Sequence, residues 1–303
     1  MDRFLQAHAI RHIDSGLGIY EAAEEMTKAW IAKIGIICTG VVRSAQSNYI
    51  LIIGAVEEEL SGLRQKLNNP VDSTSGHRRI TSGDLYGRPV KLLVTGPGMV
   101  NTAQALTAAL ERHRPRLIIQ TGCAGAFQEA GLHIGDVAVA TEEIDIHTGL
   151  ESVSTPGSVD DLPFILFKTG TGEFKNRFPI NGGLAGRAFD ILQSGFEGSD
   201  FQIHKGPFIT VSTITATDAR AATLFEKFRP CMEGMEGAAT AQIAALYDIP
   251  FLEIRAAANF VGDRDRDAWD LDLAFKNLTL TILKLIQAIN INLIDDYFKK
   301  NDA

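Results

Sequence analysis

The sequence predicts a three-layer α/β fold, in which a sheet lies between two layers of helices. Short apolar runs such as Tyr49–Val56 and Phe251–Ala256 have the length and composition of buried strands. These runs alternate along the chain with stretches of helical periodicity. With 303 residues, of which 45% are hydrophobic and 22% charged, the chain is long enough for one large domain and an extension.

The first half of the predicted domain combines strands, a hairpin and two helices. An amphipathic pattern after the first strand predicts a helix, and the pair Tyr86-Gly87 predicts the turn of a hairpin. In chain order, the predicted elements are the strand Tyr49–Val56, the helix Glu57–Leu67, the hairpin strands Arg79–Leu85 and Arg88–Val94, the glycine-rich turn Thr95–Asn101, the helix Thr102–Arg112, and the strands Leu117–Gln120 and Gly135–Ala140.

The second half begins with a long segment rich in glycine and proline, Leu150–Lys205, for which the pattern predicts one helix near Gly186–Gln193. The last predicted helix has apolar residues at helical spacing with polar residues opposite, as in a surface helix that covers a sheet. After the long segment, the predicted elements are the strand Pro207–Thr213, the helix Ala219–Lys227, the small-residue helix Glu236–Tyr247, the strand Phe251–Ala256 and the helix Ala274–Leu293.

Residues 1–48 are interpreted as an N-terminal extension of uncertain role. Its apolar stretch at residues 32–42 is short and interrupted by Lys33, so it does not predict a membrane span. The acidic, helical-looking start also lacks the pattern of a signal peptide. We therefore expect no membrane partner for this chain.

The composition limits partners and compartment. A net charge of -8 and a pI near 5.4 oppose a nucleic-acid-binding surface, which needs a basic footprint. The odd and widely spaced cysteines form no disulfide or metal pattern, so we expect a reducing, cytoplasmic location. The histidines likewise lack ligand spacing, and neither a metal nor a cofactor is expected. The residues concerned are Cys38, Cys123, Cys231, His133, His147 and His204.

Ligands in α/β folds bind at the carboxyl ends of strands. Four predicted loops lie at or near such strand ends and are therefore candidates for a binding site. They are Glu57–Glu59, Gly96–Asn101, Gly122–Gly125 and Asn259–Trp269.

Each loop, taken alone, also has an ordinary structural explanation. The glycines of TGPGMVN could bring backbone amides to an anion, but the lysine of a P-loop is absent and a tight strand-to-helix turn suffices. Cys123 in TGCAG could be a nucleophile, yet no histidine is tied to it in sequence, and cysteine is a common small buried residue. The backbone amides of TGCAG are the better candidates for binding.

The acidic residues allow two interpretations as well. The run Glu57-Glu58-Glu59 and the residue Glu236 lie at the starts of predicted helices, where the helix dipole favours carboxylates. A carboxylate there could instead act as a general base or accept hydrogen bonds from sugar hydroxyls. The charge-dense stretch GDRDRDAWD is either a solvated loop or a mobile lid.

The order of the motifs indicates a function that no single motif establishes. LIIGAVEEEL, TGPGMVN, TGCAG, MEGAA and FLEIRAAANFVGDRD resemble, in that order, the nucleoside phosphorylase and nucleosidase superfamily. Within it, VSTITATDARAA and ANFVGDRD are most similar to the futalosine hydrolases, followed by the methylthioadenosine/S-adenosylhomocysteine nucleosidases. The resemblance implies a three-layer αβα sandwich with a mixed central sheet, a nucleosidase domain at residues 49–295 and a tail at residues 296–303.

The resemblance also implies roles for single residues. Glu59 corresponds to the residue that activates water, and Glu236 to the ligand of the ribose hydroxyls, with Met235 against the sugar. Asn259 falls where adenine-specific nucleosidases carry an aspartate. Further implied substrate-binding residues are Cys123, Ala124, Gly125, Thr217, Phe260, Arg264 and Trp269. By position, Arg264 and Arg266 are candidates for the carboxylate of the futalosine tail.

Asn259 bears on the choice of base. An ionised carboxylate only accepts hydrogen bonds, whereas a carboxamide can donate to O6 or N7 of a 6-oxopurine. An unmatched polar group enclosed with the base costs about 1–3 kcal/mol, which is enough to discriminate. Asn259 therefore favours hypoxanthine as the leaving base, and it would stabilise charge on the purine without protonating N7.

Hydrolysis is favoured over phosphorolysis by the turn after the first strand. Phosphorylases of this superfamily carry a phosphate-binding arginine there, where this chain reads Gly54-Ala55-Val56-Glu57-Glu58. We expect an N-ribosyl hydrolase that releases hypoxanthine from futalosine in menaquinone biosynthesis, acting as a homo-oligomer of at least two subunits. One alternative is a methylthioadenosine/S-adenosylhomocysteine or aminofutalosine nucleosidase, which Asn259 opposes. The other is a purine-nucleoside-binding module without turnover, which Glu59 and Glu236 oppose.

Overall fold

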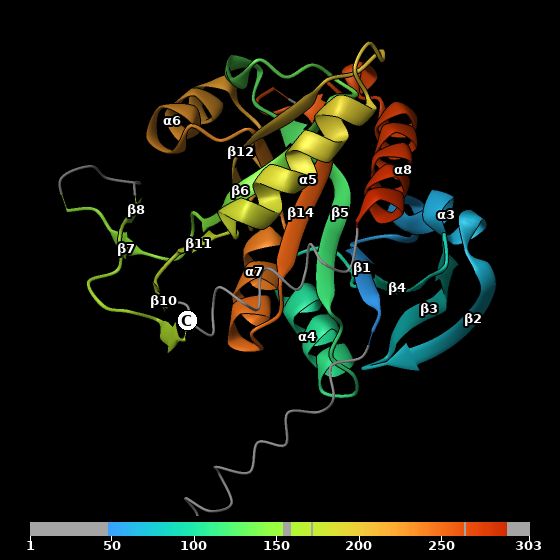
Figure 1. The fold of residues 1–303 in the computed structure, drawn as a ribbon. Coiled ribbons are helices and arrows are strands. Elements are labelled where there is room, and N and C mark those ends of the chain that lie inside the picture. The colour runs from blue at the N-terminus through green and yellow to red at the C-terminus, as the bar shows by residue number, and fades with distance from the viewer. Residues whose placement is uncertain (1–47, 154–158, 171, 264, 290–303) are drawn as a thin grey trace, which may run out of the picture. The chain divides into compact units, whose positions relative to one another are not determined.

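Most of the strands join in one mixed sheet (Figure 1). The computed structural model describes residues 48–153, 159–170, 172–263 and 265–289. The strands of the sheet are β1 (Ile50–Gly54), β2 (Asn68–Ser75), β3 (Arg78–Leu85), β4 (Arg88–Val94), β5 (Leu117–Ala126), β6 (Val137–Asp145), β11 (Arg177–Pro179), β12 (Ile203–Thr210), β13 (Met232–Gly234) and β14 (Phe251–Phe260).

The order of the strands is β11-β6-β12-β13-β5-β1-β4-β3-β2, and β14 pairs with both β5 and β6. β1 runs parallel to β4 and β5, and β14 runs parallel to β5 but antiparallel to β6. The carboxyl ends of β1, β5 and β14 therefore lie at one edge of the sheet, where the fold places its candidate site.

Helices cover both faces of this sheet, and the predicted three-layer fold is confirmed (Figure 1). On one face α8 packs against both α3 and α5, and on the other α4 packs against α7. The helices are α3 (Glu57–Lys66), α4 (Met99–Leu110), α5 (Gly182–Gly195), α6 (Asp218–Phe228), α7 (Gly237–Leu246) and α8 (Leu271–Ala288), with short 3-10 turns at η1 (Gln128–Ala130) and η2 (Arg266–Ala268). None of these helices of the described chain is long and apolar enough to cross a membrane.

The core explains why the central strands read as unbroken apolar runs. β1 is buried along its whole length, and β14 is buried from Phe251 to Ala258. Strands covered by helices on both faces need apolar residues at every position rather than at alternate ones. The small residues of α7 let that helix lie close to the sheet, which brings its first turn near the ends of β5 and β14.

Several predicted boundaries were wrong. β5 continues to Ala126 and β14 to Phe260, so Gly122–Gly125 and Asn259 lie in strands and not in loops. A bulge between Ala257 and Asn259 shifts the register and places Asn259 opposite Gly125. Because these segments consist mainly of alanine and glycine, the sequence pattern was interpreted as loops, and it did not reveal that the two strands continue and pair.

Other elements differ in extent or were not predicted. α4 begins at Met99 inside the predicted turn, α5 extends beyond the predicted helix at both ends, and β6 and β12 are displaced from their predicted limits. The sequence did not predict β2, whose residues NNPVDSTS are mostly exposed, nor the three-residue β13. The long segment also contains the short pairs β7 (Leu150–Glu151) with β8 (Val159–Asp160) and β9 (Phe167–Thr169) with β10 (Gly172–Phe174).

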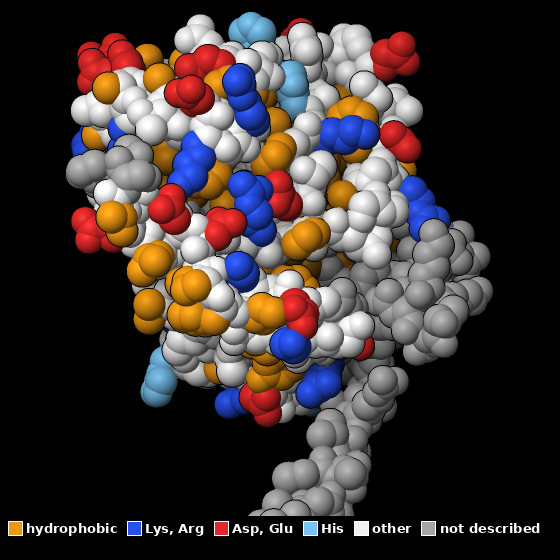
Figure 2. Space-filling model, turned by 90° about the vertical axis from the view of Figure 1, so that its left-hand side faces the viewer, with side chains coloured by type: hydrophobic (Ala, Val, Ile, Leu, Met, Phe, Trp, Pro, Cys, Tyr) orange, Lys and Arg blue, Asp and Glu red, His pale blue; other side chains and the backbone are white. Residues whose placement is uncertain are grey.

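Apolar side chains gather on the side of the molecule where β7 to β10 lie (Figures 1 and 2). In this segment the exposed residues include Leu150, Val153, Phe164 and Leu166. A nearby hollow of about 350 Å³ is lined by apolar side chains, among them Phe174, Phe178 and Ile180, together with the polar residues Asn181 and Asp248. Exposed apolar surface of this kind is typical of a protein–protein contact, and the predicted homo-oligomer remains a prediction.

Candidate active site

Glu59 lies in the first turn of α3, directly after β1, and is 4% exposed. Its Oε2 accepts hydrogen bonds from the backbone N–H groups of Ala55 (2.7 Å) and Val56 (3.3 Å). Its Oε1 accepts a hydrogen bond from the N–H of Cys123 at 2.9 Å. These bonds fix the carboxylate between the carboxyl ends of β1 and β5. Burial raises the pKa of Glu59 above its usual value, while the positive charge of Arg255 opposes the rise.

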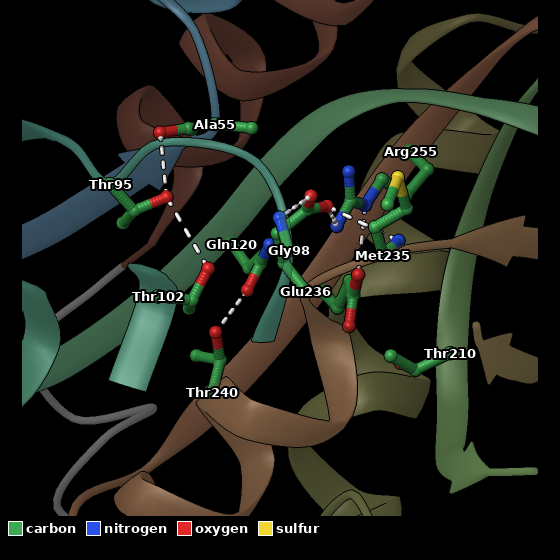
Figure 3. Close-up of polar contacts among 12 residues, drawn as sticks. Ala55, Thr95, Gly98, Thr102, Gln120, Thr210, Met235, Glu236, Thr240 and Arg255 are labelled. Carbon is green, nitrogen blue, oxygen red and sulfur yellow. Dashed lines mark hydrogen bonds and ion pairs between the residues drawn. The ribbon is translucent and has the colours of Figure 1, made fainter. Parts of the chain in front are cut away.

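Glu236 is the residue that precedes α7, and it is also 4% exposed. Its Oε1 accepts a hydrogen bond from the N–H of Gly98 at 2.9 Å, and its Oε2 accepts one from Nη2 of Arg255 at 3.0 Å (Figure 3). Gly98 has a φ of 87°, a conformation that glycine adopts without strain. The glycine-rich turn therefore directs a backbone amide at a carboxylate of the protein itself.

Arg255 on β14 contacts Glu236 and the backbone of Cys123, the residue whose N–H donates to Glu59, and sequence reasoning missed it. The side chain is almost fully buried and donates from Nε to Oε1 of Glu253 at 2.8 Å, from Nη2 to Glu236, and from Nη1 to the carbonyl of Cys123 at 3.3 Å. The carboxylates raise its pKa, so it is a fixed positive charge. A signal was present in the sequence: Glu253 and Arg255 occur two residues apart in an apolar strand, hence on one face, and buried charges require partners.

Cys123 contributes its backbone to the site. Its N–H donates to Glu59 and its carbonyl accepts from Arg255. Burial and the nearby carboxylate of Glu59 raise the pKa of the thiol to about 12. The thiolate needed for a nucleophile is therefore scarce at neutral pH, which agrees with the preference for the backbone amides of TGCAG.

Gly122 and Gly125 allow close approach at this edge. A Cβ at Gly122 would lie 2.4 Å from Oε1 of Glu59 and 2.8 Å from Nη1 of Arg255, so only glycine fits. A Cβ at Gly125 would lie 3.4 Å from Nδ2 of Asn259. Asn259 is half-buried and donates from Nδ2 to the carbonyl of Phe260 at 2.7 Å.

The structure thus brings Glu59, Glu236, Cys123 and Arg255 into direct contact, with Asn259 beside the same segment of β5. Met235 adjoins Glu236 and packs against the smaller apolar cluster beneath α6. Ala124 is buried within β5, and Phe260 is half-buried at the end of β14.

The remaining predicted residues lie toward the loop that follows β14. Thr217 caps α6, since its hydroxyl accepts a hydrogen bond from the N–H of Arg220 at 3.3 Å. The next residue, Asp218, accepts a hydrogen bond from the N–H of Asp263 at 2.9 Å, which ties this loop to α6. Trp269 is half-buried after η2, and Arg264 lies outside the described residues.

The histidines have structural partners. Nε2 of His204 lies 3.1 Å from Oδ2 of Asp136, and Nδ1 of His133 lies 3.5 Å from the same atom. His147 accepts a hydrogen bond from the N–H of Ser212. Within the described ranges, the His, Cys, Asp and Glu side chains form no group of three that could hold a metal ion.

Comparison with known proteins identifies the family. A family model described as the phosphorylase superfamily matches residues 49–289. The chain belongs to the phosphorylase superfamily. The 5'-methylthioadenosine/S-adenosylhomocysteine nucleosidase of Bacillus thuringiensis (strain Al Hakam) is 31% identical over 244 residues, which are 79% of this chain and 99% of that protein.

Solved structures of the superfamily share the fold. The 5'-methylthioadenosine/S-adenosylhomocysteine nucleosidase from Neisseria meningitidis, in complex with methylthio-immucillin-A, matches with a TM-score of 0.68 and 25% identity, covering 80% of this chain and 100% of that one. The enzyme of that name from Helicobacter pylori, with butyl-thio-DADMe-Immucillin-A, matches with a TM-score of 0.68 over 80% and 99% of the chains, at 17% identity. This phosphorylase-superfamily member is an enzyme of the nucleosidase class, which hydrolyses N-glycosidic bonds.

Proposed function

We propose that this enzyme hydrolyses the N-ribosidic bond of futalosine and releases hypoxanthine. The observation that carries the proposal is the carboxamide of Asn259, half-buried beside Gly125, on the strand that also carries Arg255. A carboxamide nitrogen has two N–H groups. One donates to the carbonyl of Phe260, which leaves the second for O6 or N7 of a 6-oxopurine.

Water, and not phosphate, is the proposed nucleophile. In an anion-binding turn the backbone N–H groups face the anion. Here the N–H groups of Ala55, Val56 and Cys123 already donate to the carboxylate of Glu59. A phosphate at this turn would face that buried negative charge, and these three amides would not be free to hold it.

Glu59 is proposed as the general base. An ionised carboxylate offers about four lone-pair positions, shared between its two oxygens. Oε1 of Glu59 uses one of its positions to accept the hydrogen bond from the N–H of Cys123. Oε1 can therefore also accept a proton from a water molecule. The raised pKa brings the carboxylate closer to neutral pH and strengthens it as a base.

Glu236 is proposed to bind the ribose. Its Oε2 accepts hydrogen bonds from Arg255 and, at 3.4 Å, from the N–H of Met235, whereas its Oε1 accepts one from Gly98 and keeps a lone pair for a sugar hydroxyl. We propose a dissociative step, in which the bond from ribose to N9 breaks before water attacks the oxocarbenium ion. Asn259 then stabilises the negative charge that develops on the purine.

The carboxylate of the futalosine tail requires a positive partner. Arg264 and Arg266 follow β14, and the structure adds Arg78 as a third candidate. Nη2 of Arg78 donates to Oδ1 of Asn101 at 2.7 Å and Nε donates to Oε1 of Gln104 at 3.2 Å, both neutral amides. A Cβ at Gly96 would lie 2.9 Å from Nη1 of Arg78, in the same turn that holds Glu236.

Inosine separates tail recognition from base recognition, because it has the same base and ribose but no carboxylate. Arg78→Ala and Arg266→Ala should be compared for KM with futalosine and with inosine. The arginine that meets the tail raises KM for futalosine alone. If neither substitution does so, the tail carboxylate is bound by Arg264 or by another group.

The principal test is Asn259→Asp, with Asn68→Asp on exposed β2 as a control for the added charge. A mismatch of about 1–3 kcal/mol corresponds to a five- to 150-fold loss in kcat/KM for futalosine. Release of adenine from aminofutalosine or methylthioadenosine should increase relative to release of hypoxanthine. An unchanged preference between the two bases would contradict the role of Asn259.

The second candidate is a methylthioadenosine/S-adenosylhomocysteine nucleosidase. The names of the curated relatives favour it. It uses the same assignment of Glu59 and Glu236 but involves a different base and a different 5′ substituent, and the Asn259→Asp experiment also tests its choice of base.

A further inference from the structure

Two carboxyl groups meet beneath the first turn of α7, outside the residues assigned above to substrate. Glu143 comes from β6 and Glu253 from β14, and each is 1% exposed. A Cβ at Gly237 would lie 2.2 Å from Oε1 of Glu143 and 2.4 Å from Oε2 of Glu253. Both oxygens therefore lie against the same glycine, in a space that any larger residue would fill.

The hydrogen bonds of the two groups differ. Oε2 of Glu143 accepts the hydroxyl of Thr210 at 2.6 Å, and the N–H of Ala238 donates to that hydroxyl oxygen at 2.8 Å. Oε1 of Glu253 accepts from Nε of Arg255. Oε2 of Glu253 is buried and finds no hydrogen-bond donor among the protein groups that the structure describes, unless Glu143 carries a proton.

The charges also require a proton here. The charged groups that face Glu143 are Glu253 and Arg255 of β14, while β12 contributes Thr210 and α7 its first turn. Arg255 already pairs with Glu253 and Glu236. A further buried carboxylate would have no cation left to balance it. In agreement, burial and the charge of Glu253 raise the pKa of Glu143 well above its usual value, against smaller opposing effects of Thr210 and Arg255.

We propose that Glu143 and Glu253 share one proton, and that this pair positions Arg255 and, through it, the ribose ligand Glu236. The protonated carboxyl of Glu143 donates to Oε2 of Glu253. Glu253 keeps its charge and directs Nε of Arg255, which leaves Nη2 aimed at Glu236. The kinetic part of this inference rests on the proposed function, whereas the shared proton does not depend on the substrate.

Glu143→Gln tests the shared proton directly. The carboxamide oxygen of glutamine can accept the hydroxyl of Thr210, and its nitrogen can donate permanently to Glu253. We expect this variant to keep kcat and KM close to wild type. Glu143→Leu removes the donor, and we expect kcat/KM to fall about 10–100-fold, as misplaced catalytic groups do. Glu142→Gln, at the neighbouring position that pairs with exposed Arg177, is the matched control.

The pH dependence provides a second readout, which a purely structural role would not alter. A group with a raised pKa in the folded state adds stability that is complete below its unfolded pKa and is lost as the pH rises toward the folded pKa. The melting temperature of the wild type should therefore fall above about pH 4.5 relative to that of Glu143→Gln. Infrared spectroscopy should also show a buried protonated carboxyl group in the wild type that is absent from Glu143→Gln.

The outcomes separate this inference from the proposed function. If Glu143→Gln is as impaired as Glu143→Leu, or if it melts with the same pH dependence as the wild type, the shared proton is refuted. If no nucleoside is hydrolysed by any variant, the proposed function fails, while the melting and infrared data still decide the inference. If Glu143→Leu does not fold, the comparison between wild type and Glu143→Gln suffices.

Discussion

Replacing Arg255 by methionine removes the cation that pairs with the buried Glu236 and Glu253 at the site. Arg255 makes hydrogen bonds to Glu253 (2.8 Å), Glu236 (3.0 Å) and the carbonyl of Cys123 (3.3 Å). Breaking a buried pair by removing one partner costs about 3–5 kcal/mol, because the remaining charge is left unbalanced. In a domain of this size, a loss of 1 kcal/mol lowers the melting temperature by about 2–4 °C. We therefore expect a fall of about 6–20 °C at pH 8.

The loss should be smaller at pH 5. Without the arginine, the pKa values of the neighbouring carboxyl groups rise, so protonation relieves the unbalanced charge at low pH. Urea unfolding or calorimetry at both pH values measures the difference. Arg266→Met, in the exposed turn η2, is the control and should change stability by no more than about 0.5 kcal/mol. A loss for Arg255→Met as small as this control, or equal at pH 5 and pH 8, would refute the charge argument.

Three further predictions concern the base, the thiols and the assembly. Glu59→Gln should lower kcat about 10²–10⁴-fold with little change in KM, and an unaltered kcat would contradict the role of Glu59 as base. Because the pKa of Glu59 is raised, the acidic limb of the wild-type pH–rate profile should lie above pH 4.5. Burial raises the pKa of Cys123 to about 12 and that of Cys231 to about 11, so both should react with iodoacetamide far more slowly at pH 7 than after unfolding, and equal rates would oppose this. Light scattering should give at least a dimer that Phe164→Asp weakens, whereas a wild-type monomer would contradict the oligomer.

The site illustrates what sequence reasoning can reach. Glu59 and Glu236 each belong to a recognisable motif, and in the structure hydrogen bonds through Cys123 and Arg255 link their carboxylates. Both glutamates lie close in sequence to a strand end or a helix start. Such positions can be inferred from local pattern, because the carboxyl ends of parallel strands meet at one edge.

Arg255 and Glu143 show what local pattern cannot reach. Each is a charged residue within a mostly buried strand, and its partners across the sheet depend on which strand lies beside it. β14 runs parallel to β5 and antiparallel to β6, and only this arrangement brings Glu143 to Glu253. The periodicity of a segment does not show which strand, more than 100 residues away in the sequence, it pairs with. For the same reason the extension of β14 through Asn259 was missed, since it follows from the pairing with Gly125.

The measurement that tests the central claim most directly is the free base released from futalosine, aminofutalosine, methylthioadenosine and inosine, each with and without phosphate, resolved by chromatography. We predict hypoxanthine from futalosine at a rate that phosphate does not change, and no adenine from methylthioadenosine. Release of adenine in place of hypoxanthine would contradict the account, because Asn259 would then not determine the base.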